Sequence, residues 1–125
     1  MFTIDSDSTI HITRGDIGVI EVSAMKSETE PYVFQSGDVV RLRVFTKKRH
    51  DLVVLMKDIH VDTEAETVSI PLSNSDTAIG EIINKPVDYW YEVELNPDTA
   101  PQTIVGYDLK GPKIFKLYPE GGDLV

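Results

Sequence analysis

Val-Asp-Tyr-Trp-Tyr-Glu-Val-Glu-Leu occupies residues 87–95 and is the longest clear alternation in the chain. Successive side chains of a β-strand point to opposite faces, so this stretch has one face of large apolar residues (Tyr89, Tyr91, Val93, Leu95). The opposite face carries acids and a single Trp90. The pattern predicts a strand with one side on a core and the other in water.

The same period of two recurs on both sides of this stretch, whereas helical periodicity hardly appears. Uninterrupted apolar residues at 52–56 favour a strand covered on both faces, which we expect to lie centrally in a sheet. Capping residues followed by Gly80 predict one short helix within 73–80. The predicted strands are 9–13, 17–25, 39–46, 52–56, 68–72, 87–95, 102–109 and 113–117.

About eight short strands with turn signals every 8–12 residues are typical of an antiparallel sandwich or a barrel, and we favour the sandwich. The 125 residues predict a single domain spanning 1–125, with an ordered core at about 9–118 and flexible ends. The Tyr89-x-Tyr91 pair follows a Pro-Val-Asp corner and has two interpretations. It contains either a corner tyrosine of a Greek-key sandwich or two core tyrosines whose hydroxyls contact solvent.

Composition narrows the function classes. Twelve Lys and Arg against 21 Asp and Glu give a net charge of −9, which disfavours nucleic acid as a partner. The chain has no cysteine, so thiol chemistry, thiolate metal sites and disulfides are excluded. Its apolar runs are far shorter than the ~20 residues of a membrane helix, so we expect no membrane insertion.

Three short motifs suggest binding sites, but each has a simpler interpretation. Arg14-Gly15-Asp16 is a tripeptide that adhesion receptors bind, and it is also an ordinary turn. Asp58-x-His60-x-Asp62 places three potential metal ligands on one strand face, where solvated polar residues are also common. The segment 5–16 begins like a calcium loop but lacks its glycine and closing glutamate. We therefore predict no metal and no cofactor.

Catalytic motifs have little support in this sequence. The histidines His11, His50 and His60 are not accompanied by a nucleophile elbow, and no phosphate-binding loop is present. A small hydrolase ranks third among our hypotheses. It requires a pocket around His60 or a close pair of acids. The basic cluster at 47–50 is interpreted as gatekeeping charge in a turn between apolar strands.

Outward aromatic residues suggest an interaction surface. Phe45 and Trp90 lie on the faces opposite the apolar rows of their strands. Large apolar side chains on a solvent-exposed face favour a contact that covers them. A loop or the tail of the chain is an alternative cover. We predict a contact surface of Arg41, Arg43, Phe45 and Trp90. It would bind another protein or, as the alternative hypothesis, a carbohydrate that stacks on the exposed rings.

The order of several segments resembles the small virion proteins encoded by tailed phages and prophages of Gram-positive bacteria. The nearest type is the N-terminal domain of the baseplate upper protein. The likeness spans residues 10–118, and the order of the segments carries it more than any one of them. The segments are 12–16 (Ile-Thr-Arg-Gly-Asp), 32–42 (Tyr-x-Phe, then Gly-Asp-Val-Val-Arg-Leu), 75–77 (Ser-Asp-Thr), 89–95 (Tyr-x-Tyr-Glu-Val-x-Leu) and 102–109 (Gln-Thr-Ile-Val-x-Tyr-x-Leu).

The resemblance implies an immunoglobulin-like β-sandwich that serves as a non-enzymatic assembly module. Its partners would be other virion proteins or further copies of itself, and its place would be the virion, assembled in the cytoplasm of the bacterial host. The chain departs from the family in its acidic connection at 27–30 and in the lack of a receptor-binding or coiled-coil extension after the last strand. A head or tail decoration is therefore as compatible with the likeness as a baseplate part.

Overall fold

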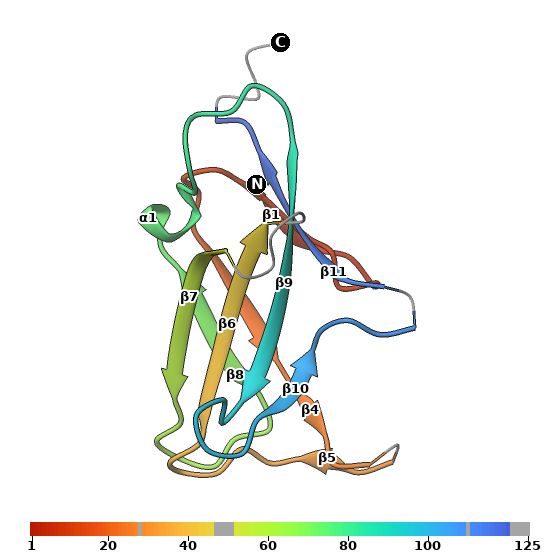
Figure 1. Ribbon diagram of the computed structural model, residues 1–125. Helices are drawn as coiled ribbons and strands as arrows, with labels where there is room; N and C mark the ends of the chain where they lie inside the picture. The colour runs from red at the N-terminus through yellow and green to blue at the C-terminus, as the bar shows by residue number, and fades with distance from the viewer. Residues whose placement is uncertain (28, 47–51, 110, 121–125) are drawn as a thin grey trace.

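A computed structural model describes residues 1–27, 29–46, 52–109 and 111–120 (Figure 1). Across these ranges the chain is all-β with one very short helix, α1 (Asn74–Thr77). Within the described residues no helix is long and apolar enough to cross a membrane. The strands are β1 (Phe2–Ile4), β2 (Ile10–Thr13), β3 (Gly18–Val22), β4 (Ala24–Met25), β5 (Pro31–Tyr32), β6 (Val39–Thr46), β7 (Val53–His60), β8 (Val68–Leu72), β9 (Val87–Leu95), β10 (Gln102–Val105) and β11 (Lys113–Tyr118).

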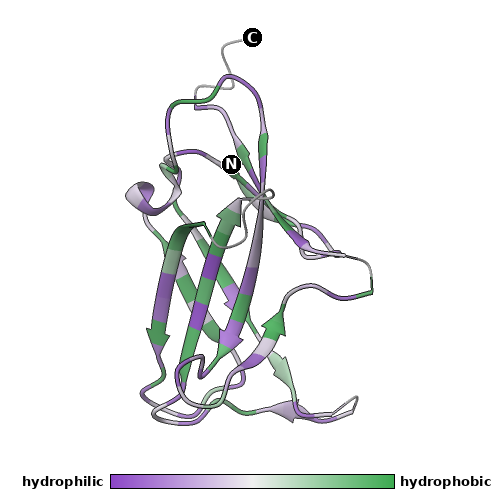
Figure 2. Cartoon of the chain, in the orientation of Figure 1, coloured by the Kyte–Doolittle hydropathy of each residue, from purple (hydrophilic) through white to green (hydrophobic). Residues whose placement is uncertain are grey.

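The main sheet has the order β1-β2-β11-β9-β6-β7, and β10 pairs with β9 beyond the end of β11. The register of β6 on β9 sets Val40, Leu42 and Val44 beside Leu95, Val93 and Tyr91. All six of these side chains are buried. Alternate residues of the same two strands face outward and most of them are charged, which appears as alternating bands along β6 and β9 in Figure 2.

A second sheet of β3 and β8 covers the inward face of the main sheet. The buried cluster unites inward residues of the main sheet, such as Phe115 and Ile12, with Ile20 of β3 and Ile70 of β8. Fully burying one such side chain contributes roughly 1.5–3 kcal/mol. Two sheets packed through their inner faces form a sandwich, so the predicted fold class is confirmed.

Strand β7 differs from its prediction. The apolar run at 52–56 was expected to be central and covered on both faces, but β7 is the edge strand of the main sheet and extends to His60. Leu52, Val53 and Met56 are 50%, 39% and 55% exposed. The prediction of a central strand was wrong, because an apolar run at the edge of a sheet has the same composition as one in its middle.

Other differences lie in strand pairing and strand ends. β2 and β11 are parallel, so the main sheet is mixed and not purely antiparallel. The predicted strand at 17–25 is interrupted at Ser23 between β3 and β4, and the strand at 102–109 ends at Val105. Strand β1 lies before the predicted ordered core and pairs with β2. Such pairings join distant segments, which local patterns do not specify.

The predicted helix is confirmed as α1. Ser73 accepts a hydrogen bond from the backbone N–H of Asp76, whose carboxylate accepts one from the N–H of Ser73. This reciprocal capping box satisfies backbone groups at the start of the helix. Asp76 also binds Lys57 of β7. After the helix, Gly80 has a φ of +64°, a conformation that favours glycine.

Tyr91 matches neither interpretation of the tyrosine pair. Its ring is buried in the core, but its hydroxyl donates a hydrogen bond to the backbone oxygen of Ser8, far upstream in the chain. A corner tyrosine would bond to a carbonyl only a few residues away. The bond therefore links β9 to the segment between β1 and β2. Burial raises the pKa of Tyr91 to about 12, and the charge of Asp7 adds to this effect.

We expect Tyr91→Phe to lower the free energy of unfolding by about 1–2 kcal/mol at pH 7, since the Ser8 oxygen loses its donor. The unfolded chain ionises Tyr91 near its ordinary pKa of 10, whereas the folded chain does so only near 12. Stability contributed by the wild-type tyrosine is thus present below pH 10 and lost as the pH rises to 12. Urea titrations should show that the difference in free energy of unfolding between the wild-type protein and Tyr91→Phe narrows from pH 10 to pH 12.

Tyr107→Phe serves as the control, because Tyr107 is 75% exposed and its hydroxyl should contribute little. If Tyr91→Phe and Tyr107→Phe lowered the free energy of unfolding equally at pH 7, the role assigned to the Tyr91 hydroxyl would be contradicted.

Candidate functional site

The four residues predicted to form an interaction surface lie together on the outer face of the main sheet. Phe45 pairs with Trp90 across β6 and β9, and in the same register Arg43 lies opposite Glu92 and Arg41 opposite Glu94. β6 and β9 thus bring residues about 50 positions apart in the sequence onto one surface. The two arginines of this surface and its two aromatic rings make different contacts.

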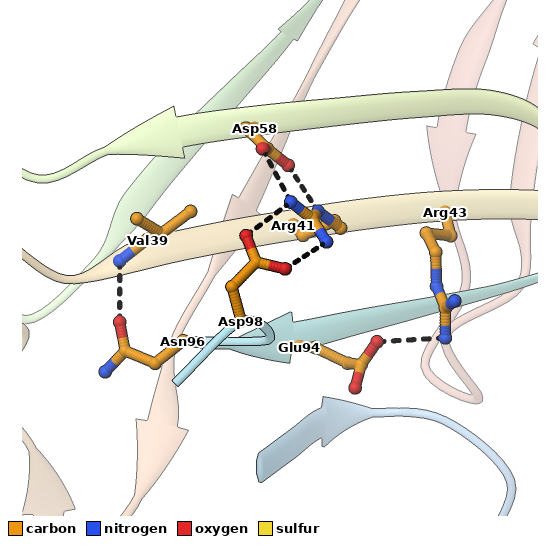
Figure 3. A network of polar contacts seen from close by, with 7 residues as sticks. All are labelled: Val39, Arg41, Arg43, Asp58, Glu94, Asn96 and Asp98. Atoms are coloured by element: carbon orange, nitrogen blue, oxygen red, sulfur yellow. Dashed lines mark hydrogen bonds and ion pairs between the residues drawn. The ribbon is translucent and has the colours of Figure 1, made fainter. Parts of the chain in front are cut away.

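Arg41 is held between two acids (Figure 3). Its Nε and Nη2 donate to the two carboxylate oxygens of Asp58 at 2.7 and 3.0 Å, and its Nη1 and Nη2 donate to Asp98 at 3.2 and 3.1 Å. Two parallel bonds of this kind fix the guanidinium plane as well as neutralising its charge. The pKa of Arg41 is raised by the bond to Asp58 first and then by Asp98. Only 17% of the Arg41 side chain is exposed.

Arg43 is also bound to acids of the neighbouring strand. It forms ion pairs with Glu92 and Glu94 of β9. The pair with Glu94, at 2.9 Å, is shown in Figure 3. Its Nε is buried and has no hydrogen-bond partner among the described residues. Both arginines of the predicted surface are therefore already engaged within the chain.

The start of β6 is fastened to the turn that follows β9. Asn96, with a φ of +49°, accepts a hydrogen bond from the Val39 N–H at 2.9 Å (Figure 3) and donates one to Asp38 at 3.1 Å. Asp38 also accepts a bond from the Tyr32 hydroxyl, which raises the pKa of Tyr32 to about 12. Although burial opposes it, the bonds to Asp38 hold the pKa of that carboxyl below its ordinary value. This network fixes the end of the surface that carries Arg41.

The aromatic half forms a row of three rings. The Phe45 and Trp90 centroids are 6.5 Å apart with planes at 79°, and those of Trp90 and Tyr107 are 6.5 Å apart at 67°. Both are edge-to-face arrangements, which aromatic pairs favour. Trp90 is half-buried between its neighbours, and its buried Nε1 has no partner among the described residues. Tyr107, at 75% exposure, is the accessible ring of the row.

Sequence analysis did not select Tyr107 for this surface. The residue lay within the predicted strand at 102–109, but β10 ends at Val105, so Tyr107 belongs to the segment after the strand. Its contact with Trp90 joins that segment to β9, and local alternation does not specify such a contact.

The structure also places the other motifs. Arg14 donates to the carbonyls of Ile79 and Gly80, and Gly15 has a φ of +86°, as the turn interpretation of Arg14-Gly15-Asp16 requires. Asp58 of the Asp-x-His-x-Asp pattern binds Arg41. In the described ranges no group of three histidine or acidic side chains could hold a metal ion. The basic cluster at 47–50, with His50, lies outside the described residues.

A second surface without a sequence-based prediction lies on the outside of β3 and β8. Ile17 and Val19 are 73% and 52% exposed there. With Pro71 and Leu72 they line a shallow groove of about 400 Å³, at whose rim lie Lys57 and Ser73. Adjacent apolar side chains on the surface of a small protein are a common feature of contact sites.

Comparison with protein-family models, curated proteins and solved structures finds no match to this chain. Its function is therefore inferred from its own residues and their geometry.

We expect Asp58→Asn to reduce the free energy of unfolding by about 1–2 kcal/mol at pH 7, because a bidentate, charge-assisted contact with Arg41 is lost. The bond from Arg41 lowers the pKa of Asp58 in the folded state, against the opposing effect of burial. Stability from this carboxylate is thus present above the unfolded pKa of about 4 and is lost as the pH falls further. Denaturant titrations from pH 7 to pH 2 should show that the free energies of unfolding of the wild-type protein and Asp58→Asn converge.

Asp98→Asn is the matched control on the same arginine. Asp98 is 75% exposed, so its removal should cost at most about 0.5 kcal/mol. A larger loss for Asp98→Asn than for Asp58→Asn would disprove the assignment of Asp58 as the principal partner.

Proposed function

We propose that this chain is a non-enzymatic structural protein of a bacteriophage or prophage virion and acts through protein–protein contacts. Its partners are other virion proteins or further copies of itself, in a head, tail or baseplate position. The resemblance of residues 10–118 to small virion proteins supports this role.

The observation that carries the proposal is the contrast between paired charges and exposed apolar groups. The arginines on the outer face of the main sheet are bound to acids of the same chain. Ile17, Val19 and Met56, by contrast, present apolar side chains to solvent. Exposed apolar side chains favour association with another protein, because their burial releases water, and the arginines of the outer face already have partners within the chain.

The proposal predicts that the chain is incorporated into particles. Peptides of the chain should be found by quantitative mass spectrometry in gradient-purified particles from the strain that carries the gene, at a fixed ratio to the major capsid protein. Deletion of the gene should give incomplete particles. Normal particles from the deletion strain, with the chain found only in the unassembled fraction of the wild type, would contradict the proposal.

A carbohydrate-binding module is the second candidate. The row of Phe45, Trp90 and Tyr107 favours it, because an exposed ring supported by two others offers a stable platform for a sugar face.

For this candidate, binding on a glycan array should fall at least tenfold in Tyr107→Ala, since Tyr107 is the accessible ring. Val19→Ala is the control, because Val19 is an exposed apolar residue (52%) on the opposite sheet. Absence of glycan binding by the wild-type protein, or equal binding by Tyr107→Ala, excludes this function for the aromatic row.

A further inference from the structure

Residues of two strands, β4 and β10, line a cavity of about 460 Å³. One wall is the run of residues 23–26, which contains β4, and the other is the run 102–104 of β10. Tyr32 and Leu95 complete the lining. We call this cavity the β4–β10 slot. In Figure 1 β10 and β4 lie next to each other at the side of the sandwich.

Each wall of the slot is a strand with one partner in the described part of the chain. β10 pairs with β9, and β4 pairs with β5. Each strand therefore has a second edge that no described strand occupies. A bulge between Thr103 and Val105 interrupts the ladder of β10 on β9 at Ile104, whose half-buried side chain lines the slot. The backbone groups of these edges are available to a further strand.

Strand β10 lacks the features that protect other edges of this protein. β8 carries Pro71, which cannot donate to a further strand, and β7 carries the charged pair Lys57 and Asp58. The sequence of β10 is Gln-Thr-Ile-Val, without proline or charge, and three of its four residues are β-branched. Residues of this kind favour strand pairing.

The size of the slot fits a short extended segment. From a rise of about 3.3 Å, a strand spacing of about 4.8 Å and a sheet spacing of about 10 Å, one strand residue fills roughly 160 Å³. A volume of about 460 Å³ therefore accommodates about three residues. Leu95, Ile104 and Ala24 line it with buried or half-buried apolar side chains, while Gln102 and Ser23 are exposed. A bound strand would place alternate apolar side chains inward.

We propose that the β4–β10 slot binds an extended segment of a partner protein, which adds as a strand between β10 and β4. The segment has apolar residues at alternate positions and Lys or Arg between them. Lys26, the charged residue that lines the slot, is paired with Glu30 at 3.2 Å, so the net charge of −9 still attracts a basic partner. This deepens the proposed function by naming how the chain contacts a partner. It rests on that function only for the source of the segment, because strand addition would occur with a partner from any assembly.

A capped heptapeptide, Lys-Val-Lys-Val-Lys-Val-Lys, is a suitable probe. At saturating peptide, amide hydrogen exchange of residues 23–26 and 102–105 should slow at least tenfold in both segments together, because the new strand pairs with both edges. The same peptide N-methylated on its three valines loses three of its seven residue N–H donors and should bind at least tenfold more weakly. A Glu-Val peptide of equal length should also bind more weakly, because the chain is acidic.

Protein variants provide the second control. Ile104→Lys should weaken binding of the heptapeptide at least tenfold, whereas Val19→Lys, on the outside of β3, should leave it unchanged. Unchanged exchange in both segments at millimolar peptide would overturn the proposal, and so would equal binding of the N-methylated peptide. These outcomes are independent of whether the chain is found in particles, so a failure here is distinguishable from a failure of the virion role.

Discussion

The register between β6 and β9 determines both faces of the main sheet. It sets Leu42 beside Val93 on the inside and Arg43 beside Glu92 on the outside. Because side chains alternate, a slip of one residue would expose the apolar row and bury the charged one. The core against β3 and β8, the ion pairs and the aromatic row therefore all depend on this single alignment.

Most charged side chains on the resulting outer face have partners within the chain. Arg41 and Arg43 bind acids of β7, β9 and the turn after β9, so their charges add rigidity to the sheet more than attraction for a ligand. Groups open to a partner lie elsewhere: the ring of Tyr107, the apolar groove beside Val19, and the backbone edges of β4 and β10. Each of the three offers a partner shape, apolar contact or backbone pairing.

Elements defined by local patterns were predictable from the sequence. The alternation at 39–46 and 87–95 gave the bounds of β6 and β9, and the capping residues around 73–80 located α1, because side-chain period and backbone capping are local properties. That Arg41, Arg43, Phe45 and Trp90 face away from the apolar rows was likewise predictable.

Properties that depend on distant segments were not predictable. The edge position of β7 and the parallel pairing of β2 with β11 are set by which strands meet in three dimensions. The binding of Arg41 to Asp98 and the contact of Tyr107 with Trp90 join turns to strands across long stretches of sequence. A sequence pattern specifies which face a residue occupies, but not which side chain lies beside it.

Residue-resolved amide hydrogen exchange of the free protein is the most direct test of this arrangement. β6 lies between β7 and β9, so its amides should exchange only through global unfolding. Alternate amides of β7, which point to the open side of an edge strand, should exchange at least a hundredfold faster. Uniform protection of β7 at the level of β6 would contradict the strand order, and with it the distinction between a satisfied sheet face and open strand edges.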